Sequence, residues 1–206
     1  YIDELSEVVK KLQPSMVFCI DPSSEKQFRS HEPEIPTNTE ALIEALTDAR
    51  VIKTENELVC LRKASQVNDE AYGQVIRHWK PGMYEYQAKA IFTEVQMSHG
   101  LQQDAYNGIY ASGPNSAILH YVSNTRKTQD GELFLIDAGF EYKGYASDFS
   151  RTFPVNGRFT SDQAAVYDAV LTAQKQVIEA IRPGVRMEDL HMMTARTMME
   201  GLLGMG

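Results

Sequence analysis

The sequence is poor in cysteine, with only Cys19 and Cys60 among its 206 residues. Two cysteines are too few for a disulfide scaffold, and the chain contains no Asn-x-Ser/Thr sequon. No stretch approaches the roughly 20 apolar residues that a membrane helix needs, and no signal peptide opens the chain. These absences predict a protein of a reducing, cytoplasmic compartment that has no membrane partner.

Positive charge is also scarce, because 20 Lys and Arg stand against 28 Asp and Glu, a formal net charge of −8. The phosphate backbone of nucleic acid would repel such a chain, so nucleic acid is not an expected partner. A content of 43% hydrophobic and 23% charged residues is typical of a globular protein and argues against disorder. The chain begins without Met and stops just after an apolar helical pattern, so we expect a segment of a longer polypeptide.

Residues 1–50 predict the C-terminal part of an α/β domain. Their hydrophobic pattern indicates two helices, two short strands and a polar loop rich in proline. In chain order we expect a helix over 3–12, a strand over 16–20, the loop over 21–39, a helix over 40–46 and a strand over 50–52.

The pattern changes at Thr54, which forms a capping box with Glu57 and opens a second domain, predicted over 51–206. A helix ending at Pro81-Gly82 and followed by another helix recurs later, as a helix ending at Pro183-Gly184. This repeat indicates a domain of two similar halves, of which the first half and the start of the second are present. We expect helices over 55–79, 84–98 and 160–183, a turn-rich segment over 108–116, and strands over 133–141 and 145–155.

Asp137 follows the apolar run 133–136, which predicts a buried strand, so a carboxylate lies in a strand that is expected to be buried. An unpaired buried charge is costly. If Lys143-Gly144 is a two-residue hairpin turn, Asp137 faces Ser150 and Asp148 faces Gly139. The two aspartates then lie diagonally on one face of the ribbon, and Gly139 leaves the space between them open.

Two like charges on one buried face repel each other, and three arrangements relieve the repulsion: a shared proton, a Lys or Arg partner, or a metal ion. Arg151 lies three residues beyond Asp148, hence on the opposite face of a regular strand, and is a poor partner. Carboxylate oxygens are hard ligands that suit Mn²⁺ and accept Zn²⁺ or Co²⁺. The alternative is that Asp137 is a structural aspartate and Asp148 a surface residue.

Three further residues are candidates for a binding site. His120 follows two apolar residues, which is typical of a core histidine, but the preceding glycine- and proline-containing loop makes a functional role plausible. Tyr106 and Ile109 lie in the approach to that loop, where they could line a pocket.

Several stretches at these positions resemble the Xaa-Pro dipeptidases (prolidases) and aminopeptidase P, members of the pita-bread metallopeptidase family. The resemblance extends over about residues 50–206 and more loosely before that. The stretches that carry it are Val51–Leu58, Ser112–Tyr121, Asp137–Gly139, Ser147–Pro154 and Phe159–Tyr167.

The resemblance implies an α+β pita-bread domain with two divalent metal ions, Mn²⁺ in the first place, held by five protein ligands. Asp137 and Asp148 match the two aspartate ligands, whereas the histidine and two glutamate ligands would lie beyond Gly206. His120 matches a substrate-binding and catalytic histidine, and Tyr106 and Ile109 match the wall of the substrate pocket. With two of five ligands, the segment alone is expected to be inactive.

The implied activity of the full-length protein is hydrolysis of Xaa-Pro dipeptides, with a homodimer as the expected assembly. One alternative is a Xaa-Pro aminopeptidase, which removes the residue before proline from longer peptides. Another is a non-catalytic pita-bread protein that binds partners, and the presence of both aspartates argues against it.

Overall fold

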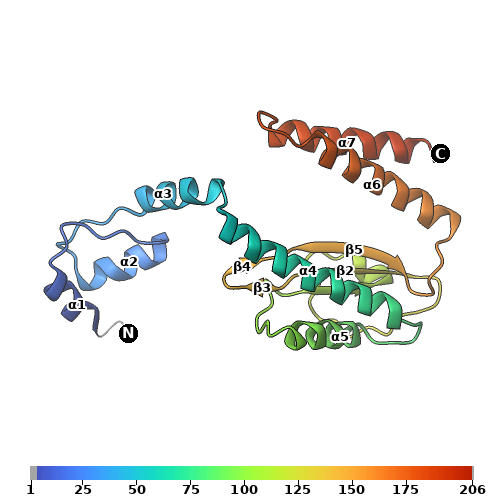
Figure 1. Cartoon of the computed structure of the whole chain (residues 1–206), viewed down its shortest axis with the longest axis horizontal. Coiled ribbons are helices and arrows are strands. Elements are labelled where there is room, and N and C mark those ends of the chain that lie inside the picture. The colour runs from blue at the N-terminus through green and yellow to red at the C-terminus, as the bar shows by residue number, and fades with distance from the viewer. Residues whose placement is uncertain (1–3, 206) are drawn as a thin grey trace. The chain divides into compact units, whose positions relative to one another are not determined.

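The computed structural model describes residues 4–205. The chain divides into two compact units, Tyr1–Val59 and Cys60–Gly206, and each is considered by itself (Figure 1). No helix within the described range is both long and apolar enough to cross a membrane.

The first unit consists of three helices: α1 (Leu5–Leu12), α2 (Pro22–His31) and α3 (Thr39–Val51). Its small core contains Val9, Cys19 and Phe28. The helix α2 begins where the Asp21 side chain accepts hydrogen bonds from two backbone amides of the first turn, with proline at its first position.

Three predictions for this unit are wrong. Residues 16–20 form only one isolated parallel bridge, between Val17 and Thr37, instead of a strand. The loop expected over 21–39 contains α2. Asp21 followed by Pro22 is a typical helix-start pattern, from which this helix could have been predicted. The strand expected over 50–52 is instead the end of α3, with Ile52 82% exposed. Short apolar runs fit a strand or a helix equally well, and no described strand neighbours these residues. Position 3 of the predicted first helix lies outside the described range.

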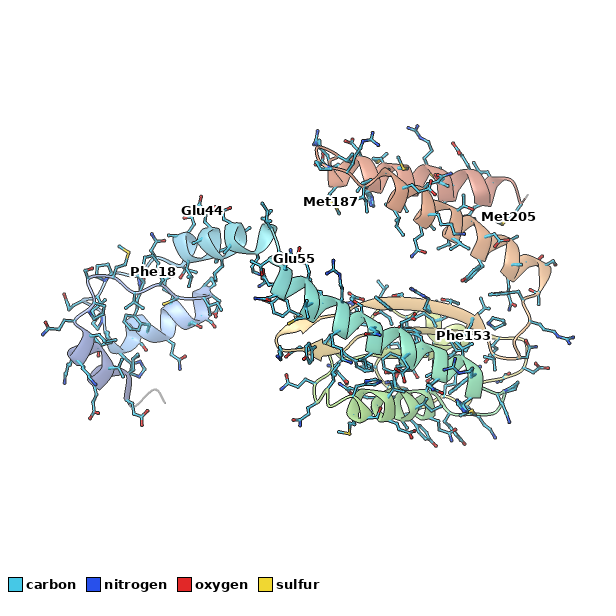
Figure 2. All side chains as sticks on the ribbon, viewed as in Figure 1. Phe18, Glu44, Glu55, Phe153, Met187 and Met205 are labelled. Carbon is cyan, nitrogen blue, oxygen red and sulfur yellow. The ribbon has the colours of Figure 1, made fainter. Side chains whose placement is uncertain are left out.

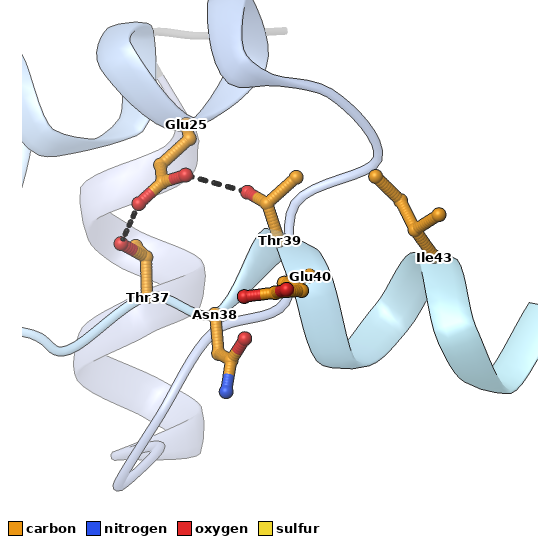
Figure 3. A pocket seen from close by; sticks show the side chains of 6 residues that line it. All are labelled: Glu25, Thr37, Asn38, Thr39, Glu40 and Ile43. Carbon is orange, nitrogen blue, oxygen red and sulfur yellow. Dashed lines mark hydrogen bonds between the residues drawn. The ribbon is translucent and has the colours of Figure 1, made fainter.

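A hollow of about 380 Å³ lies where α2 meets the start of α3 (Figure 3). The Glu25 carboxylate accepts hydrogen bonds there from the hydroxyls of Thr37, at 2.5 Å, and Thr39, at 2.6 Å. These hydroxyls hold the pKa of Glu25 below its ordinary value. The contacts tie the two helices together, so we assign the hollow a structural role.

The second unit contains most of α4, which starts before the division, and all elements after it. Its sheet is antiparallel with the order β1-β2-β5, and β3 and β4 form a separate two-stranded ribbon. The elements are α4 (Glu55–His78), α5 (Glu85–Ser98), β1 (Ile109–Ser112), the 3-10 helix η2 (Gly113–Ala117), β2 (Leu133–Ala138), β3 (Glu141–Tyr142), β4 (Tyr145–Ala146), β5 (Phe149–Pro154), α6 (Ser161–Ala180) and α7 (Met187–Leu203).

One face of the sheet packs on α4 and α5, which lie along it in Figure 1. Alternate strand residues enter this core, as the period of two requires. Phe134 is fully buried and stacks on Trp79, the residue directly after α4, at 4.5 Å between ring centroids. Phe153, labelled in Figure 2, meets Phe134 edge-on. The core thus fixes which face of β2 and β5 remains available for a site.

The predicted hairpin register is confirmed, since Asp137 pairs with Ser150 and Tyr142 with Tyr145. The two long predicted strands are each divided in two, because the ladder is interrupted at Gly139 and Asp148. The strand β1 was expected to be only a turn-rich segment. Its four residues are nevertheless paired along their whole length with β2.

The helices α6 and α7 pack against each other, with Gly201 beside Ala169 and a hydrogen bond between Thr197 and Gln176. Side chains along α7 are largely exposed between Met187 and Met205, both labelled in Figure 2. A groove of about 790 Å³ is lined by α6 and by residues of β2 and β5.

Candidate metal centre

The two predicted metal ligands converge on one atom. Asp137 lies near the end of β2, and Asp148 immediately precedes β5. The Tyr106 hydroxyl oxygen is 2.6 Å from Oδ1 of Asp137 and 2.9 Å from Oδ1 of Asp148. The two carboxylate oxygens are therefore no farther apart than the sum of these distances, as the diagonal placement predicted.

The backbone places Tyr106 at this point. The amide of Ala105 donates to the Gly139 carbonyl at 2.9 Å, and the amide of Glu141 donates to the Gln103 carbonyl at 3.0 Å. The segment before β1 therefore runs beside the end of β2, with Tyr106 directly after the contact.

Gly139 is required by this packing. A Cβ atom on it would lie 1.8 Å from the Ser147 carbonyl oxygen and 3.2 Å from the Tyr106 ring. The expectation that Gly139 leaves an open space between the aspartates is wrong, because a carbonyl group and an aromatic ring occupy that space. The missing side chain instead permits the close approach that brings the two carboxylates together.

The Tyr106 hydroxyl and the two carboxylate oxygens share only one proton between two short oxygen–oxygen contacts. A phenol carries one O–H and can donate to only one carboxylate at a time, so the second short oxygen–oxygen contact needs another proton or a cation. Burial and the hydrogen bonds to both carboxylates raise the pKa of Tyr106, so its hydroxyl stays protonated as a donor. Two carboxylate oxygens facing one point fit a hard divalent ion.

Ile109 lies opposite Asp137 in the β1–β2 ladder, so the two side chains share one face of the sheet. Ser150 lies opposite Asp137 on the other side and also lines the groove beside α6. Ile109 and Asp137 are both half-buried and Asp148 is exposed, so this face is open to a small molecule. The expectation of a fully buried Asp137 is wrong, because its side chain is half-buried and the face that carries it borders a groove and not a closed core.

His120 follows η2 and is exposed, with its backbone in the left-handed region at φ 53°. Within residues 4–205 no group of three or more His, Cys, Asp or Glu side chains could hold a metal ion, so His120 does not join the two aspartates in such a cluster. The structure thus joins Asp137, Asp148, Tyr106 and Ile109 and leaves His120 apart.

Tyr72 of α4 supports the site in a way the sequence did not reveal. Its buried hydroxyl bonds to the carbonyls of Ile136, at 3.1 Å, and Phe149, and accepts the Ala138 amide at 3.2 Å. These residues flank the two aspartates. Helical periodicity predicts that Tyr72 is buried, but no local pattern shows which backbone groups its hydroxyl reaches.

A helix-and-sheet domain in which two carboxylates from neighbouring strands converge on an open face defines a candidate metallohydrolase. The family profile of metallopeptidase family M24 matches residues 59–206. The chain therefore belongs to metallopeptidase family M24.

Relatives with assigned activities fall into two groups. The chain is 36% identical to the human Xaa-Pro dipeptidase, over all of this chain and 44% of that protein. It is 39% identical to the Xaa-Pro aminopeptidase of Escherichia coli strain K12, over 77% of this chain and 36% of that protein. The chain thus spans less than half the length of these curated relatives.

Solved structures give the fold. Proline aminopeptidase P II from Yersinia pestis superposes with a TM-score of 0.89 at 34% identity, covering 99% of this chain and 50% of that chain. Zinc-substituted E. coli aminopeptidase P in complex with product superposes with a TM-score of 0.87 at 30% identity, again over 99% of this chain and 50% of that chain. The α+β pita-bread fold predicted from the sequence is confirmed, and the chain covers about half the length of these solved structures.

Proposed function

We propose that the full-length protein is a Xaa-Pro dipeptidase that hydrolyses the peptide bond before a C-terminal proline. The observation that carries the proposal is the convergence of Asp137 and Asp148 on one point of an open sheet face. Family membership and the match to the human dipeptidase over the whole chain support it.

Asp137 and Asp148 would hold the metal pair, for which we propose Mn²⁺. The donor set fits, since both ligands are carboxylate oxygens and the single Tyr106 proton cannot satisfy both of them. A divalent pair lowers the pKa of a bound water and polarises a carbonyl group. A histidine and two glutamates from outside residues 1–206 would complete the ligand set.

The chain's own residues bind and orient the substrate. Tyr106 lies between the two carboxylates and donates its one proton to either of them, which orients the ligand that it contacts. Ile109, on the same face as Asp137, supplies an apolar wall for the proline ring. His120 donates a hydrogen bond to the charge that develops on the substrate carbonyl oxygen, which requires the loop that carries it to lie beside the metals in the full-length protein.

A Xaa-Pro aminopeptidase is the second candidate, and a specific observation favours it. The probable Xaa-Pro aminopeptidase pepP of Botryotinia fuckeliana is 40% identical over 166 residues, more than the human dipeptidase. The two activities differ in whether the pocket requires a free carboxylate directly after the proline. For either activity we propose a cytoplasmic homodimer, and the presence of both aspartates argues against a non-catalytic binding protein.

The deciding experiment compares Gly-Pro with a Gly-Pro-Xaa tripeptide as substrates of the full-length, Mn²⁺-loaded protein. The dipeptidase proposal predicts a higher kcat/KM for Gly-Pro. A preference for the tripeptide would assign the protein as an aminopeptidase. Hydrolysis of neither peptide would contradict both candidate activities.

A further inference from the structure

Glu85, the first residue of α5, is fully buried although it is a carboxylate. Burying an ionised group without partners is costly, so its surroundings need an explanation. Burial alone would raise the pKa of Glu85, but the hydrogen bonds donated to it outweigh this and hold the pKa below its ordinary value. The carboxylate is therefore ionised near neutral pH.

Five hydrogen bonds satisfy this carboxylate. Oε1 accepts from the Ser112 amide and hydroxyl, each at 2.8 Å, and from the Asn115 side-chain amide at 3.2 Å. Oε2 accepts from the Tyr121 hydroxyl at 2.7 Å and from the Arg126 amide at 2.9 Å. All five donors belong to one stretch, residues 112–126, which begins at the end of β1 and contains His120.

A second layer of contacts fixes the two ends of this loop. The Arg126 guanidinium forms an ion pair with Glu132 and donates to the Ser112 hydroxyl at 2.9 Å. The Ser112 hydroxyl in turn donates to Glu85, which links the arginine to the buried carboxylate. Gly113 lies against this ion pair, since a Cβ there would be 2.5 Å from a Glu132 oxygen.

His120 itself sits in a conformation that requires support. Its φ of 53° lies in the left-handed region, which is unfavourable for a residue with a Cβ. Such conformations persist where the surrounding structure holds them. The next residue along the chain, Tyr121, donates a hydrogen bond from its hydroxyl to Glu85 and so anchors the backbone beside His120.

We propose that Glu85 is the positioning residue for His120: its carboxylate fixes the loop so that the imidazole is presented in one orientation. This inference rests on the proposed function, in which His120 contacts the substrate. Glu85 itself touches no substrate and acts through Tyr121 and the loop backbone.

The test is a double-mutant cycle on the full-length, Mn²⁺-loaded protein with Gly-Pro or Gly-Pro-Xaa, whichever it cleaves. Tyr121→Phe removes one hydrogen bond to Glu85 and keeps the ring, so we expect kcat/KM to fall about tenfold. His120→Ala should lower it about a hundredfold. Because Tyr121 acts through His120, the double variant should lose no more than His120→Ala alone.

Two matched controls lie on α5. Tyr86→Phe removes a hydroxyl from a ring that is 51% exposed, and Glu94→Gln neutralises an exposed carboxylate. Both should keep wild-type kcat/KM. Glu85→Gln places a side-chain NH2 group where hydrogen-bond donors meet the carboxylate, so its kcat/KM should fall at least as much as that of Tyr121→Phe.

The outcomes are distinct. Losses that add fully in the double variant, or a Tyr121→Phe variant as active as wild type, would overturn the positioning role while leaving the peptidase intact. An inactive wild-type protein would instead overturn the proposed function, and the positioning role with it. Since Tyr121→Phe keeps Glu85 and its four other hydrogen bonds, the test does not depend on Glu85→Gln folding.

Discussion

Gly139 is the residue on which the local geometry of the candidate metal centre depends. The Ser147 carbonyl and the Tyr106 ring both approach it to distances that no side chain would permit. The Tyr106 hydroxyl then reaches both aspartates. The sequence predicts the aspartate pair through the alternation of a strand, but the close approach at Gly139 depends on residues far away in the chain.

Replacing Gly139 with alanine should destabilise the protein. The Ser147 carbonyl is backbone and cannot rotate away from a Cβ at 1.8 Å, so β2 or the ribbon must move, at a cost of about 1–3 kcal/mol or more. Thermal unfolding of the full-length Gly139→Ala variant should show a lower midpoint, and its metal content should fall. The control is Gly73→Ala in α4, where only the flexible Arg77 tip must shift and alanine favours the helix. A midpoint equal to wild type for Gly139→Ala would contradict this packing.

Acid stability should depend on Glu85. Its folded-state pKa lies below the ordinary 4.5, so the unfolded state binds a proton more readily in acid. The stability that Glu85 contributes is fully present above pH 4.5 and is lost as the pH falls from 4.5 through the folded-state pKa. Glu85→Gln should therefore differ most from wild type near neutral pH and approach it in acid. Unfolding midpoints measured from pH 7 to pH 3 check this, and a difference that grows toward acid would contradict it.

At the scale of elements, long periodic segments were predicted well and short ones poorly. The capping box at Thr54 and Glu57 is present, and α4, α5 and α6 lie within a few residues of their expected bounds. Helices of this length carry enough periodic positions to be recognised. The runs at 16–20 and 50–52 are too short for that, and β1 lies in a glycine-containing segment whose pairing with β2 is a tertiary property.

The link between α4 and the sheet can be tested at Tyr72. Its hydroxyl bonds to three backbone groups beside the aspartates, so Tyr72→Phe leaves buried groups without partners and should cost about 1–3 kcal/mol. Hydrogen exchange at the Ala138 amide should become faster. The control is Tyr110→Phe, because the Tyr110 ring is also in the core and its hydroxyl bonds to no group in the described part of the chain. Unchanged protection of Ala138 in Tyr72→Phe would contradict the supporting role.

At the scale of the whole molecule, the chain matches about half the length of the solved aminopeptidase P structures and carries two carboxylates of a candidate metal centre. It spans 36–44% of the curated relatives compared above, and within residues 4–205 no third ligand joins Asp137 and Asp148. Sequence reasoning found the two aspartates because both lie on one hairpin, whose register follows from a local turn. It could not place His120 relative to them, because the position of a loop residue depends on tertiary packing and not on a local register.

The most direct test of the account is the metal content of the full-length protein after equilibration with Mn²⁺. The account predicts about two ions per chain for wild type, and a clear loss for both Asp137→Asn and Asp148→Asn, with the fold retained by circular dichroism. Asp168→Asn, an exposed aspartate of α6, should bind as wild type does. If the Asp137 and Asp148 variants retained the full two ions, the two residues would not be metal ligands and the account would be contradicted.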